Sequence, residues 1–232
     1  MRPLVVLPTY NEIANVVPML EALREYQGLD VVVVDDASPD GTGELAQTYA
    51  QSVKGVTVLH RSGKTGLGSA YRAGFAWALE RNYSHVVEID CDFSHDPRSL
   101  GSLLTFALTH DVVVGSRYVP GGATSGWSLS RQFLSRAGGL YASTLLGLHI
   151  KDPTSGFRVY SARGLERLDY ASVSSDGYGF QIEMTYRARL AELSITEVPI
   201  TFCERAAGSS KMSPSIVIEA LSWVTRTALT RT

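Results

Sequence analysis

The chain has 232 residues, 44% of them hydrophobic, which is enough for one large α/β domain with a substantial core. Its 21 basic and 23 acidic residues nearly balance, which argues against a nucleic-acid-binding protein, because such proteins usually carry a basic excess. The two cysteines, Cys91 and Cys203, are too few for a disulfide framework and lack metal-ligand spacing. A reducing, cytoplasmic location is therefore expected, and no segment has the length and apolar character expected of a transmembrane helix.

The first half of the chain alternates between short apolar runs and segments with a helical pattern. The predicted strands are Leu4–Leu7, Val31–Val34, Val56–Leu59, His85–Ile89 and Asp111–Gly115. The predicted helices between them are Glu12–Tyr26, Gly41–Gln51, Gly68–Arg81 and Pro97–Leu108. Strands that are apolar throughout are buried on both faces. The alternation therefore predicts a single α/β domain with a doubly wound, mostly parallel sheet and helices on both faces.

The regular alternation stops after Gly115, and longer loops appear. In chain order we expect a loop at Tyr118–Ser128, a helix at Leu129–Leu146, a strand at Phe157–Tyr160, a helix at Gly179–Leu193, a strand at Ile195–Phe202 and a charged loop at Arg205–Ser213. Loops of this length on a compact domain often act as mobile lids. Residues 216–232 form a separate amphipathic C-terminal helix after a domain of residues 1–215; it either packs on the domain or lies on a membrane surface.

Two carboxylates, Asp90 and Asp92, flank a single small residue directly after the predicted strand His85–Ile89. In open parallel sheets, ligands collect at the carboxyl ends of the strands. Two acids crowded there repel each other unless a cation neutralises them, and oxygen ligands suit Mg²⁺ or Mn²⁺, ions that typically grip a diphosphate. The alternative is a pair of ordinary solvated loop carboxylates.

Other polar groups follow the first two predicted strands. Tyr10 and Glu12 come after the first strand, and Asp35 and Asp36 after the second. Clustered on one edge of the sheet, they would build a crevice in which Tyr10 offers a flat face to a base and Asp36 accepts from a hydroxyl. Any one of them could instead be an ordinary cap or turn residue, as Asp40 is expected to be before the helix at Gly41.

Several familiar motifs are absent. The first strand is not followed by the glycine-rich turn of dinucleotide-binding proteins. The run Gly63–Thr65 imitates the end of a P-loop, but Val58 stands where the earlier glycine is required. No Gly-x-Ser-x-Gly elbow is present. A dehydrogenase, an NTPase and a serine hydrolase are therefore disfavoured.

Five motifs occur in a characteristic order: PTYNE at 8–12, VDDASPDGT at 34–42, DCDFSH at 90–95, GSRY at 115–118 and DPTSGFR at 152–158. Together they resemble the inverting family 2 glycosyltransferases of the GT-A fold, and more narrowly the dolichyl-phosphate (polyprenyl-phosphate) mannosyltransferases. The resemblance spans residues 3 to about 215. It implies transfer of mannose from GDP-mannose to a polyprenyl phosphate, with inversion, to give a β-linked lipid-phosphate sugar.

The resemblance also assigns residues to the donor. It implies that the nucleotide sugar is held by Pro8, Tyr10, Glu12, Val34 and Asp36 around the guanosine, by Asp90, Cys91 and Asp92 around the diphosphate and metal, and by Arg205 and Lys211 in a mobile loop. Cys91 departs from the alanine common in the family, a change that leaves a backbone role intact. Ser94 stands where some members have a glutamine near the metal, which bears on whether a third side chain reaches the ion.

The expected chemistry makes Asp92 and Arg117 the catalytic residues, with Asp90 and Asp92 as the metal ligands. Arg131 and Ser135 are four residues apart on a predicted helix, so they share a face and, with Arg117, form a candidate clamp for the acceptor phosphate. These are also acceptor-side positions in the family. Arg131 has a rival interpretation as a solvated helical residue.

Two other functions stay open from the sequence. One is a polyprenyl-phosphate glycosyltransferase that uses UDP-glucose or another sugar nucleotide. The other is a non-catalytic module that binds a sugar nucleotide. For the enzyme we expect a peripheral position on the cytoplasmic face of a membrane, with a membrane-anchoring subunit as a further possible partner.

Overall fold

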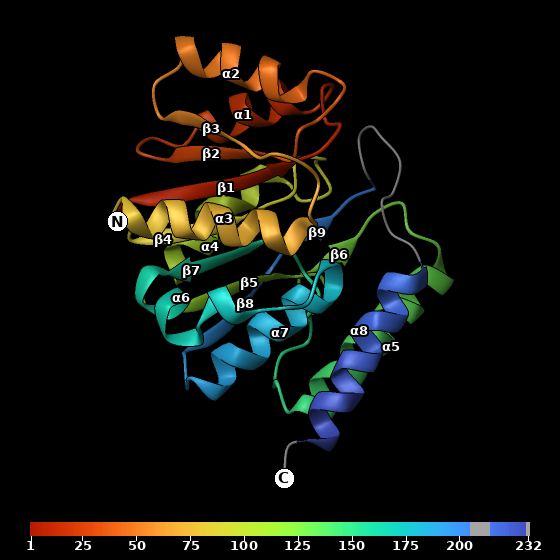
Figure 1. The fold of residues 1–232 in the computed structure, drawn as a ribbon. Helices are drawn as coiled ribbons and strands as arrows, with labels where there is room; N and C mark the ends of the chain where they lie inside the picture. Colours follow the sequence, from red (N-terminus) through yellow and green to blue (C-terminus); the bar gives the residue numbers. More distant parts are fainter. Residues whose placement is uncertain (205–213, 231–232) are drawn as a thin grey trace.

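The computed structural model describes residues 1–204 and 214–230, and its centre is a seven-stranded sheet with the order β3-β2-β1-β4-β7-β5-β8 (Figure 1). The strands are β1 (Pro3–Thr9), β2 (Asp30–Asp35), β3 (Val56–His60), β4 (His85–Glu88), β5 (Val112–Ser116), β7 (Arg158–Ser161) and β8 (Ile195–Pro199). Only β7 runs antiparallel to its neighbours in this sheet, so the prediction of a mostly parallel sheet in one domain is confirmed.

Helices cover both faces of the sheet, as predicted (Figure 1). The α-helices are α1 (Val16–Arg24), α2 (Thr42–Ser52), α3 (Leu67–Glu80), α4 (Leu100–Phe106), α5 (Leu129–Leu146), α6 (Ala162–Leu168), α7 (Gly177–Leu190) and α8 (Pro214–Leu229); short 3-10 turns lie at Pro97–Ser99 and Tyr170–Ser172. Successive strand side chains point to opposite faces. Val5 and Leu7 of β1 therefore pack with α1 and α4, whereas Leu4 and Val6 pack on the face covered by α3, α6 and α7.

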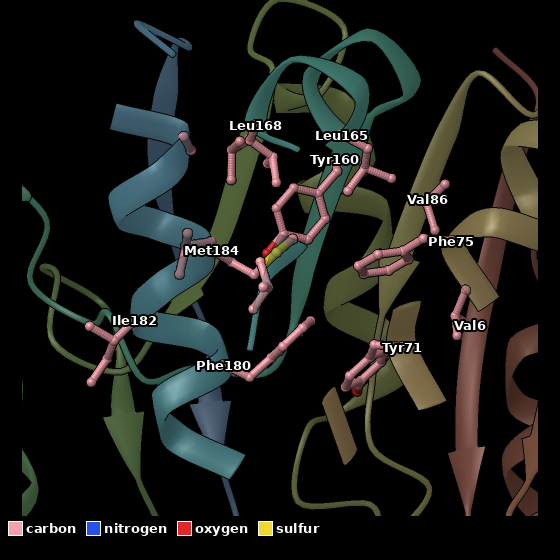
Figure 2. Packing of buried hydrophobic residues seen from close by; sticks show 14 of the residues in the cluster. Val6, Tyr71, Phe75, Val86, Tyr160, Leu165, Leu168, Phe180, Ile182 and Met184 are labelled. Atoms are coloured by element: carbon pink, nitrogen blue, oxygen red, sulfur yellow. The ribbon is translucent and has the colours of Figure 1, made fainter. Parts of the chain in front are cut away.

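Aromatic rings fill the second of these two faces. Tyr71 and Phe75 of α3 have ring centroids 6.0 Å apart, and Tyr71 also stacks on Phe180 of α7 at 5.9 Å (Figure 2). The helix α3 comes close to the sheet at Gly74, where a Cβ atom would lie 2.2 Å from a methyl group of Val6. Any side chain at this position would push α3 away from β1.

The order of the strands decides which segments meet at one edge. Because β2, β1 and β4 are neighbours and parallel, the residues that follow them lie side by side at the carboxyl edge. The antiparallel β7 starts at that same edge, so the segment 152–157 that precedes it lies beside the end of β5. A hydrogen bond of 2.8 Å from Gly115 N to Phe157 O joins the two.

The prediction of one strand over Ile195–Phe202 is wrong. The segment forms β8 and then a separate short strand, β9 (Thr201–Phe202), which pairs with β6 (Ala123–Thr124) in a two-stranded sheet. The break falls at Ile200, whose nitrogen donates to Ser116 O and whose carbonyl accepts from Ala123 N, so the chain passes from one sheet to the other there. β6 lies inside the segment predicted as a loop.

Element ends also differ from the prediction. The first helix begins at Val16 rather than Glu12, because Glu12 O accepts from the nitrogens of Asn15 and Val16 in a turn before the helix. The helix α6 was not predicted at all. With seven residues it is too short to display a helical period in the sequence.

The long helix α5 and the C-terminal α8 lie side by side, away from the centre of the sheet (Figure 1). The hydroxyls of Tyr141 and Thr225 are 2.8 Å apart between them, and Val224 of α8 is fully buried. α8 therefore packs on the domain; the division into a domain 1–215 and a helix 216–232 stays a prediction. Within the described residues, none of the helices combines the length and the hydropathy that crossing a bilayer requires.

Candidate active site

A cavity of about 770 Å³ opens at the carboxyl edge of the sheet. Most of the residues predicted for donor and acceptor line it: Pro8, Tyr10, Glu12, Asp36, Asp90, Cys91, Asp92, Arg117 and Arg131. They come from segments far apart in the sequence, which the strand order brings together. One cavity thus contains both predicted halves of the site.

Two predicted residues in the described part of the chain do not line the cavity, and two others lie outside that part. Val34 is fully buried in the core on the α3 face. Ser135 is half-buried on α5, and its hydroxyl accepts a hydrogen bond of 2.6 Å from Tyr118 Oη. Arg205 and Lys211 lie outside the described residues, and their roles stay predictions.

The predicted nucleotide end of the cavity contains an ion pair that the sequence did not suggest. Asp36 accepts from Arg61 Nη1 at 2.7 Å, and the nitrogen of Thr65 lies 3.4 Å from its other oxygen. Burial raises the pKa of Asp36 above its usual value, and Arg61 offsets part of that increase. Nearby, Lys64 Nζ lies 4.3 Å from the centre of the Tyr10 ring. Lys64, which lines the cavity, therefore adds positive charge at this end, whereas the charge of Arg61 is paired with that of Asp36.

The turns after β1 and β2 are tied to each other. Glu12 N donates to Thr42 Oγ1 at 2.9 Å, and Glu12 Oε2 accepts from the amide of Asn15 at 2.8 Å. Asp40 does not cap α2 as expected, because the residue at the cap is Gly41, with φ of +88°. Asp40 instead accepts from the nitrogen and the hydroxyl of Thr42. These bonds fix the wall on which Tyr10 and Asp36 lie.

The two acids after β4 are held from different sides. Tyr71 Oη donates to Asp90 Oδ1 at 3.2 Å, and Ser94 N donates to Asp92 Oδ1 at 2.9 Å. Burial and the charge of Asp90 raise the pKa of Tyr71 well above its usual value, so its hydroxyl stays a donor. Phe93 adopts φ of +58°, a conformation that is uncommon for a large side chain. Asp92 is 3% exposed, so the core and the backbone together orient the pair.

Two carboxylates at the cavity are a donor set that is compatible with a divalent ion. Among residues 1–204 and 214–230, no group of three His, Cys, Asp or Glu side chains is arranged as a complete metal site. The carboxylates of Asp90 and Asp92 would therefore supply only part of a coordination shell. Mg²⁺ typically binds in this way, through one or two carboxylates plus water and substrate phosphate oxygens, and the cavity has room for both.

Across the cavity, Arg117 is buried and already bonded. Its Nε and Nη2 donate to the two oxygens of Asp152 at 2.7 and 2.5 Å, and Nη2 also donates to Thr154 Oγ1 at 2.7 Å. Burial by itself would lower the pKa of Arg117, but the adjacent Asp152 raises it above its usual value. Arg117 is therefore a permanently charged group in one fixed orientation, with Nη1 left over from these bonds.

Arg131 is held much more loosely at the same cavity. Its Nη1 is 3.2 Å from Glu204 Oε1, and the two side chains are 46% and 63% exposed. The Trp127 ring joins the two arginines, with the guanidinium carbon of Arg131 at 4.1 Å and that of Arg117 at 5.5 Å from its centre. The predicted cations of the acceptor site thus meet at one aromatic ring.

The family of the chain follows from its similarity to known proteins. A family model described as glycosyl transferase family 2 matches residues 4–169, which is most of the chain. The chain belongs to glycosyltransferase family 2. The resemblance seen in its five motifs is thereby confirmed, and the cavity is the candidate active site of a glycosyltransferase.

Among family 2 relatives, an undecaprenyl-phosphate mannosyltransferase of Micrococcus luteus is 51% identical over 230 residues, covering 99% of this chain and 95% of that protein. A polyprenol monophosphomannose synthase of Mycolicibacterium smegmatis is 46% identical over 224 residues, covering 95% and 84%. Both similarities extend over nearly the whole chain, including the motifs that line the cavity.

Solved structures of the same fold include glucosyl-3-phosphoglycerate synthase from Mycobacterium tuberculosis, in complex with Mn²⁺ and UDP, with a TM-score of 0.69 at 23% identity over 99% of this chain and 79% of that one. The mannosyltransferase PcManGT from Pyrobaculum calidifontis, in complex with GDP-Man and Mn²⁺, has a TM-score of 0.63 at 18% identity over 99% and 73%. These structures establish the GT-A fold of this family 2 member.

Several polar residues that line the cavity were not predicted as site residues, among them His95, Asp176 and Gln181. His95, inside the motif at 90–95, is 2% exposed, and burial lowers its pKa to about 4. Asp176 precedes α7 and accepts from Gly68 N at 2.6 Å, at the start of α3. Gln181 lies on α7. His95 could have been found from its motif, whereas Asp176 and Gln181 follow no strand end and carry no motif.

Asp176 and the loop before α3 fit together closely. Gly66 has φ of +102°, and a Cβ atom there would lie 1.6 Å from Asp176 Oδ2. Any side chain at this position would collide with the carboxylate and would also need an unfavourable backbone conformation. The loop that carries Lys64 is therefore anchored to the start of α7, across the cavity.

Proposed function

We propose that this protein transfers mannose from GDP-mannose to a polyprenyl phosphate with inversion at the anomeric carbon, forming polyprenyl-phosphate β-mannose. One observation carries the proposal: a single cavity joins Asp90 and Asp92 to the buried Arg117, in a chain whose near full-length relatives are named for polyprenyl-phosphate mannose chemistry. The strand-end acids suit the donor diphosphate, and the arginines suit the acceptor phosphate.

The nucleophile needs no general base. A phosphate monoester has a second pKa of about 6, so its oxygens are already anionic near neutral pH. An acceptor oxygen forms a bond to the anomeric carbon while the bond from that carbon to GDP breaks, and the electron pair leaves with GDP. No proton moves in this step. Catalysis therefore rests on holding the acceptor phosphate in line with the departing diphosphate.

Departure of GDP needs more help than attack by the acceptor, because negative charge develops on the leaving diphosphate. A divalent ion held by Asp90 and Asp92 would act as a Lewis acid toward the developing charge on GDP. Burial of Asp92 and its bond from Ser94 N keep its carboxylate fixed in place. We also propose that Arg205 and Lys211 close over the diphosphate. Glu204, which directly precedes Arg205 in the sequence, lines the cavity, and this supports the proposal.

We propose that the two arginines make different contributions to binding the acceptor phosphate. Arg117 is paired with the buried Asp152, so the pair carries little net charge, and Arg117 contributes a rigid, oriented donor. Arg131 is paired only at the surface, where an ion pair contributes about 0–1 kcal/mol. It can therefore exchange Glu204 for a phosphate at small cost. Ser135 supports the site indirectly, by accepting from Tyr118.

A polyprenyl acceptor requires access to a membrane, and α5 offers a suitable surface. Leu129, Phe133 and Leu140 are four and seven residues apart, so they share one helical face, and they are 83%, 75% and 68% exposed. Arg131, on the same helix, lines the cavity. We propose that this face lies on the cytoplasmic surface of a membrane, with the cavity mouth beside the lipid head groups. An anchoring subunit stays a prediction.

The test is transfer from a panel of radiolabelled sugar nucleotides to a short polyprenyl phosphate, with and without EDTA. We expect mannose from GDP-mannose to be transferred, UDP-glucose to be a poor donor, and EDTA to abolish the product until Mg²⁺ or Mn²⁺ is restored. Transfer of glucose instead of mannose would replace the donor in this proposal. Binding of GDP-mannose without any transfer would indicate a non-catalytic module.

A further inference from the structure

Gln181 of α7 lines the cavity and carries a buried hydrogen-bond acceptor without a partner in the described part of the chain. The residue is 2% exposed and lines the cavity. Its Nε2 donates to Glu88 Oε2 at 2.9 Å, so the amide oxygen is turned away from Glu88. Within residues 1–204 and 214–230, Gln181 Oε1 has no hydrogen-bond partner. Buried polar atoms in native proteins almost always have a partner, and one at a cavity wall is normally satisfied by a ligand or water.

The surroundings hold the amide in one orientation. Glu88, at the end of β4, is fully buried, so the bond that it accepts from Gln181 Nε2 fixes the side-chain amide. The main-chain carbonyl of Gln181 accepts a bond of 2.8 Å from the hydroxyl of Thr185, which in turn accepts from Arg158, whose side chain also donates to the carbonyl of Ser155 at 2.7 Å. The helix turn that carries Gln181 is thus joined by buried hydrogen bonds to the segment before β7. A group held in this way is oriented before any ligand arrives.

That segment is open at Gly156, and three side chains surround the opening. A Cβ atom at Gly156 would lie 3.6 Å from Asp90 Oδ2, 3.8 Å from Gln181 Nε2 and 3.9 Å from His95 Cε1. Since residue 156 has no side chain, the space between these groups forms the floor of the cavity. His95 adds further unused polar atoms there, because neither of its ring nitrogens has a partner in the described part of the chain.

The position of this floor identifies what it can hold. The segment 152–156 spans the active site: Asp152 at one end bonds to Arg117, and Gly156 at the other lies beside Asp90. If Asp90 is at the diphosphate and Arg117 at the acceptor phosphate, the group that passes from one to the other lies against this segment. That group is the sugar.

We propose that the floor bounded by Gly156, His95 and Gln181 receives the hexose ring of the donor, and that Gln181 Oε1 accepts a hydrogen bond from one sugar hydroxyl. This inference rests on the proposed function and names residues that select the sugar. Selection follows because a site built around a buried acceptor rejects an analogue that cannot supply the hydroxyl, since the acceptor is then left unpaired.

Two variants test this. Gln181→Met keeps a side chain of similar length but removes the acceptor, and with it the amide that donates to Glu88. Gly156→Ala places a methyl group on the floor; it is compatible with folding, because its contacts are ordinary van der Waals distances and Gly156 does not have a positive φ. Gly101→Ala on α4, with a comparable contact of 3.5 Å to Tyr26, is the matched control.

The measurements are GDP affinity by calorimetry with Mn²⁺ and kcat/KM for GDP-mannose, together with a series of GDP-mannose analogues that each lack one hydroxyl. We expect both site variants to lose about tenfold or more in kcat/KM, while GDP affinity stays close to the wild type. The melting temperature should stay close to the wild type for Gly156→Ala and fall for Gln181→Met, because that substitution leaves Glu88 Oε2 without its bond from Gln181. For one analogue, wild type and Gln181→Met should be equally slow, because the bond is already missing.

Three results would overturn the inference. One is a Gln181→Met enzyme that is slowed by every missing hydroxyl to the same degree as the wild type. Another is a variant in which GDP affinity falls as far as kcat/KM, since the site would then serve the nucleotide. A wild-type protein that transfers no mannose overturns the proposed function and this inference together. That outcome differs from failure of this inference alone, because the product is then absent even without a substitution.

Discussion

Asp152 grips Arg117 with both carboxylate oxygens and also accepts from its backbone nitrogen at 2.9 Å, so one acid fixes both the side chain and the main chain of the arginine. The two side chains are 0% and 3% exposed. The pair joins the end of β5 to the segment before β7, at the side of the cavity that we propose for the acceptor. The orientation of Arg117 therefore depends on Asp152.

Asp152→Asn should lower the free energy of unfolding by about 3 kcal/mol or more, because it leaves a buried guanidinium without its counter-charge. Urea denaturation measures the change. Glu80→Gln, which disrupts an ion pair with Arg81 whose side chains are 71% and 45% exposed, is the control and should cost less than about 1 kcal/mol. Equal stability of the wild type and Asp152→Asn would mean that the buried pair does not support the fold.

The same pair predicts a dependence of stability on pH. Burial would raise the pKa of Asp152, but Arg117 overrides this and lowers it below the usual 3.8. An acid with a lowered folded pKa contributes stability above its unfolded pKa and loses it as the pH falls through the folded value. The difference in unfolding free energy between wild type and Asp152→Asn should therefore be constant above about pH 5 and shrink below pH 3.8. A difference that grows in acid would contradict this.

Arg131→Ala should raise the KM for the polyprenyl phosphate about tenfold and leave the KM for GDP-mannose nearly unchanged, since its role is on the acceptor side. Steady-state kinetics with each substrate varied in turn measures both. Glu204→Gln is the matched control: it removes the partner of Arg131 and should leave the acceptor KM equal or lower. A rise only in the donor KM would place Arg131 on the other side of the reaction.

Asp92→Asn should raise the Mn²⁺ concentration needed for half-maximal GDP binding by about tenfold or more, because one of two charged ligands is lost. Calorimetric titration of GDP at a series of Mn²⁺ concentrations measures this. Ser94→Ala should leave the metal dependence unchanged, since Ser94 bonds to Asp92 through its backbone nitrogen. If Ser94→Ala behaved like Asp92→Asn, its hydroxyl would belong to the metal site.

Phe133→Ser combined with Leu140→Ser should weaken binding to lipid vesicles while activity on a short, water-soluble acceptor is kept, because both side chains are exposed on α5. Co-sedimentation with vesicles containing anionic lipid measures binding. Leu108→Ser removes a side chain that is 69% exposed after α4 and serves as the control. Equal loss from Leu108→Ser would show that the α5 face has no special part in membrane binding.

Much of the donor side could be predicted from the sequence. The strands β1, β2 and β4 are continuous apolar runs, and the polar residues that matter follow them directly: Tyr10, Asp36 and Asp90. Neighbouring parallel strands end at the same edge of the sheet. The residues that directly follow them in the sequence therefore lie close together in space. The acids after β4 and the polar groups predicted for the nucleotide were expected at one edge of the sheet in this way, and they line one cavity.

The residues around Arg117 and around the cavity floor could not be predicted, because their positions depend on contacts between segments that are distant in the sequence. Arg117 is recognisable as the residue after β5, but its partner Asp152 is 35 residues away and reaches it only because β7 runs antiparallel between β4 and β5. Gln181 lies in the middle of α7 and is 93 residues from its partner Glu88. A helical period predicts which face of α7 is buried; it does not predict what that face meets.

The sequence alone determined the alternation of strands and helices, the double-sided covering of the sheet and the family. These follow from local hydrophobic periods and from short contiguous motifs. Only the tertiary structure decided the direction of β7, the division of the final strand at Ile200, the pairing of Arg117 with Asp152 and the placement of Gln181 beside Gly156. Each of these depends on free energy gained between segments distant in the chain, where the local sequence is compatible with more than one outcome.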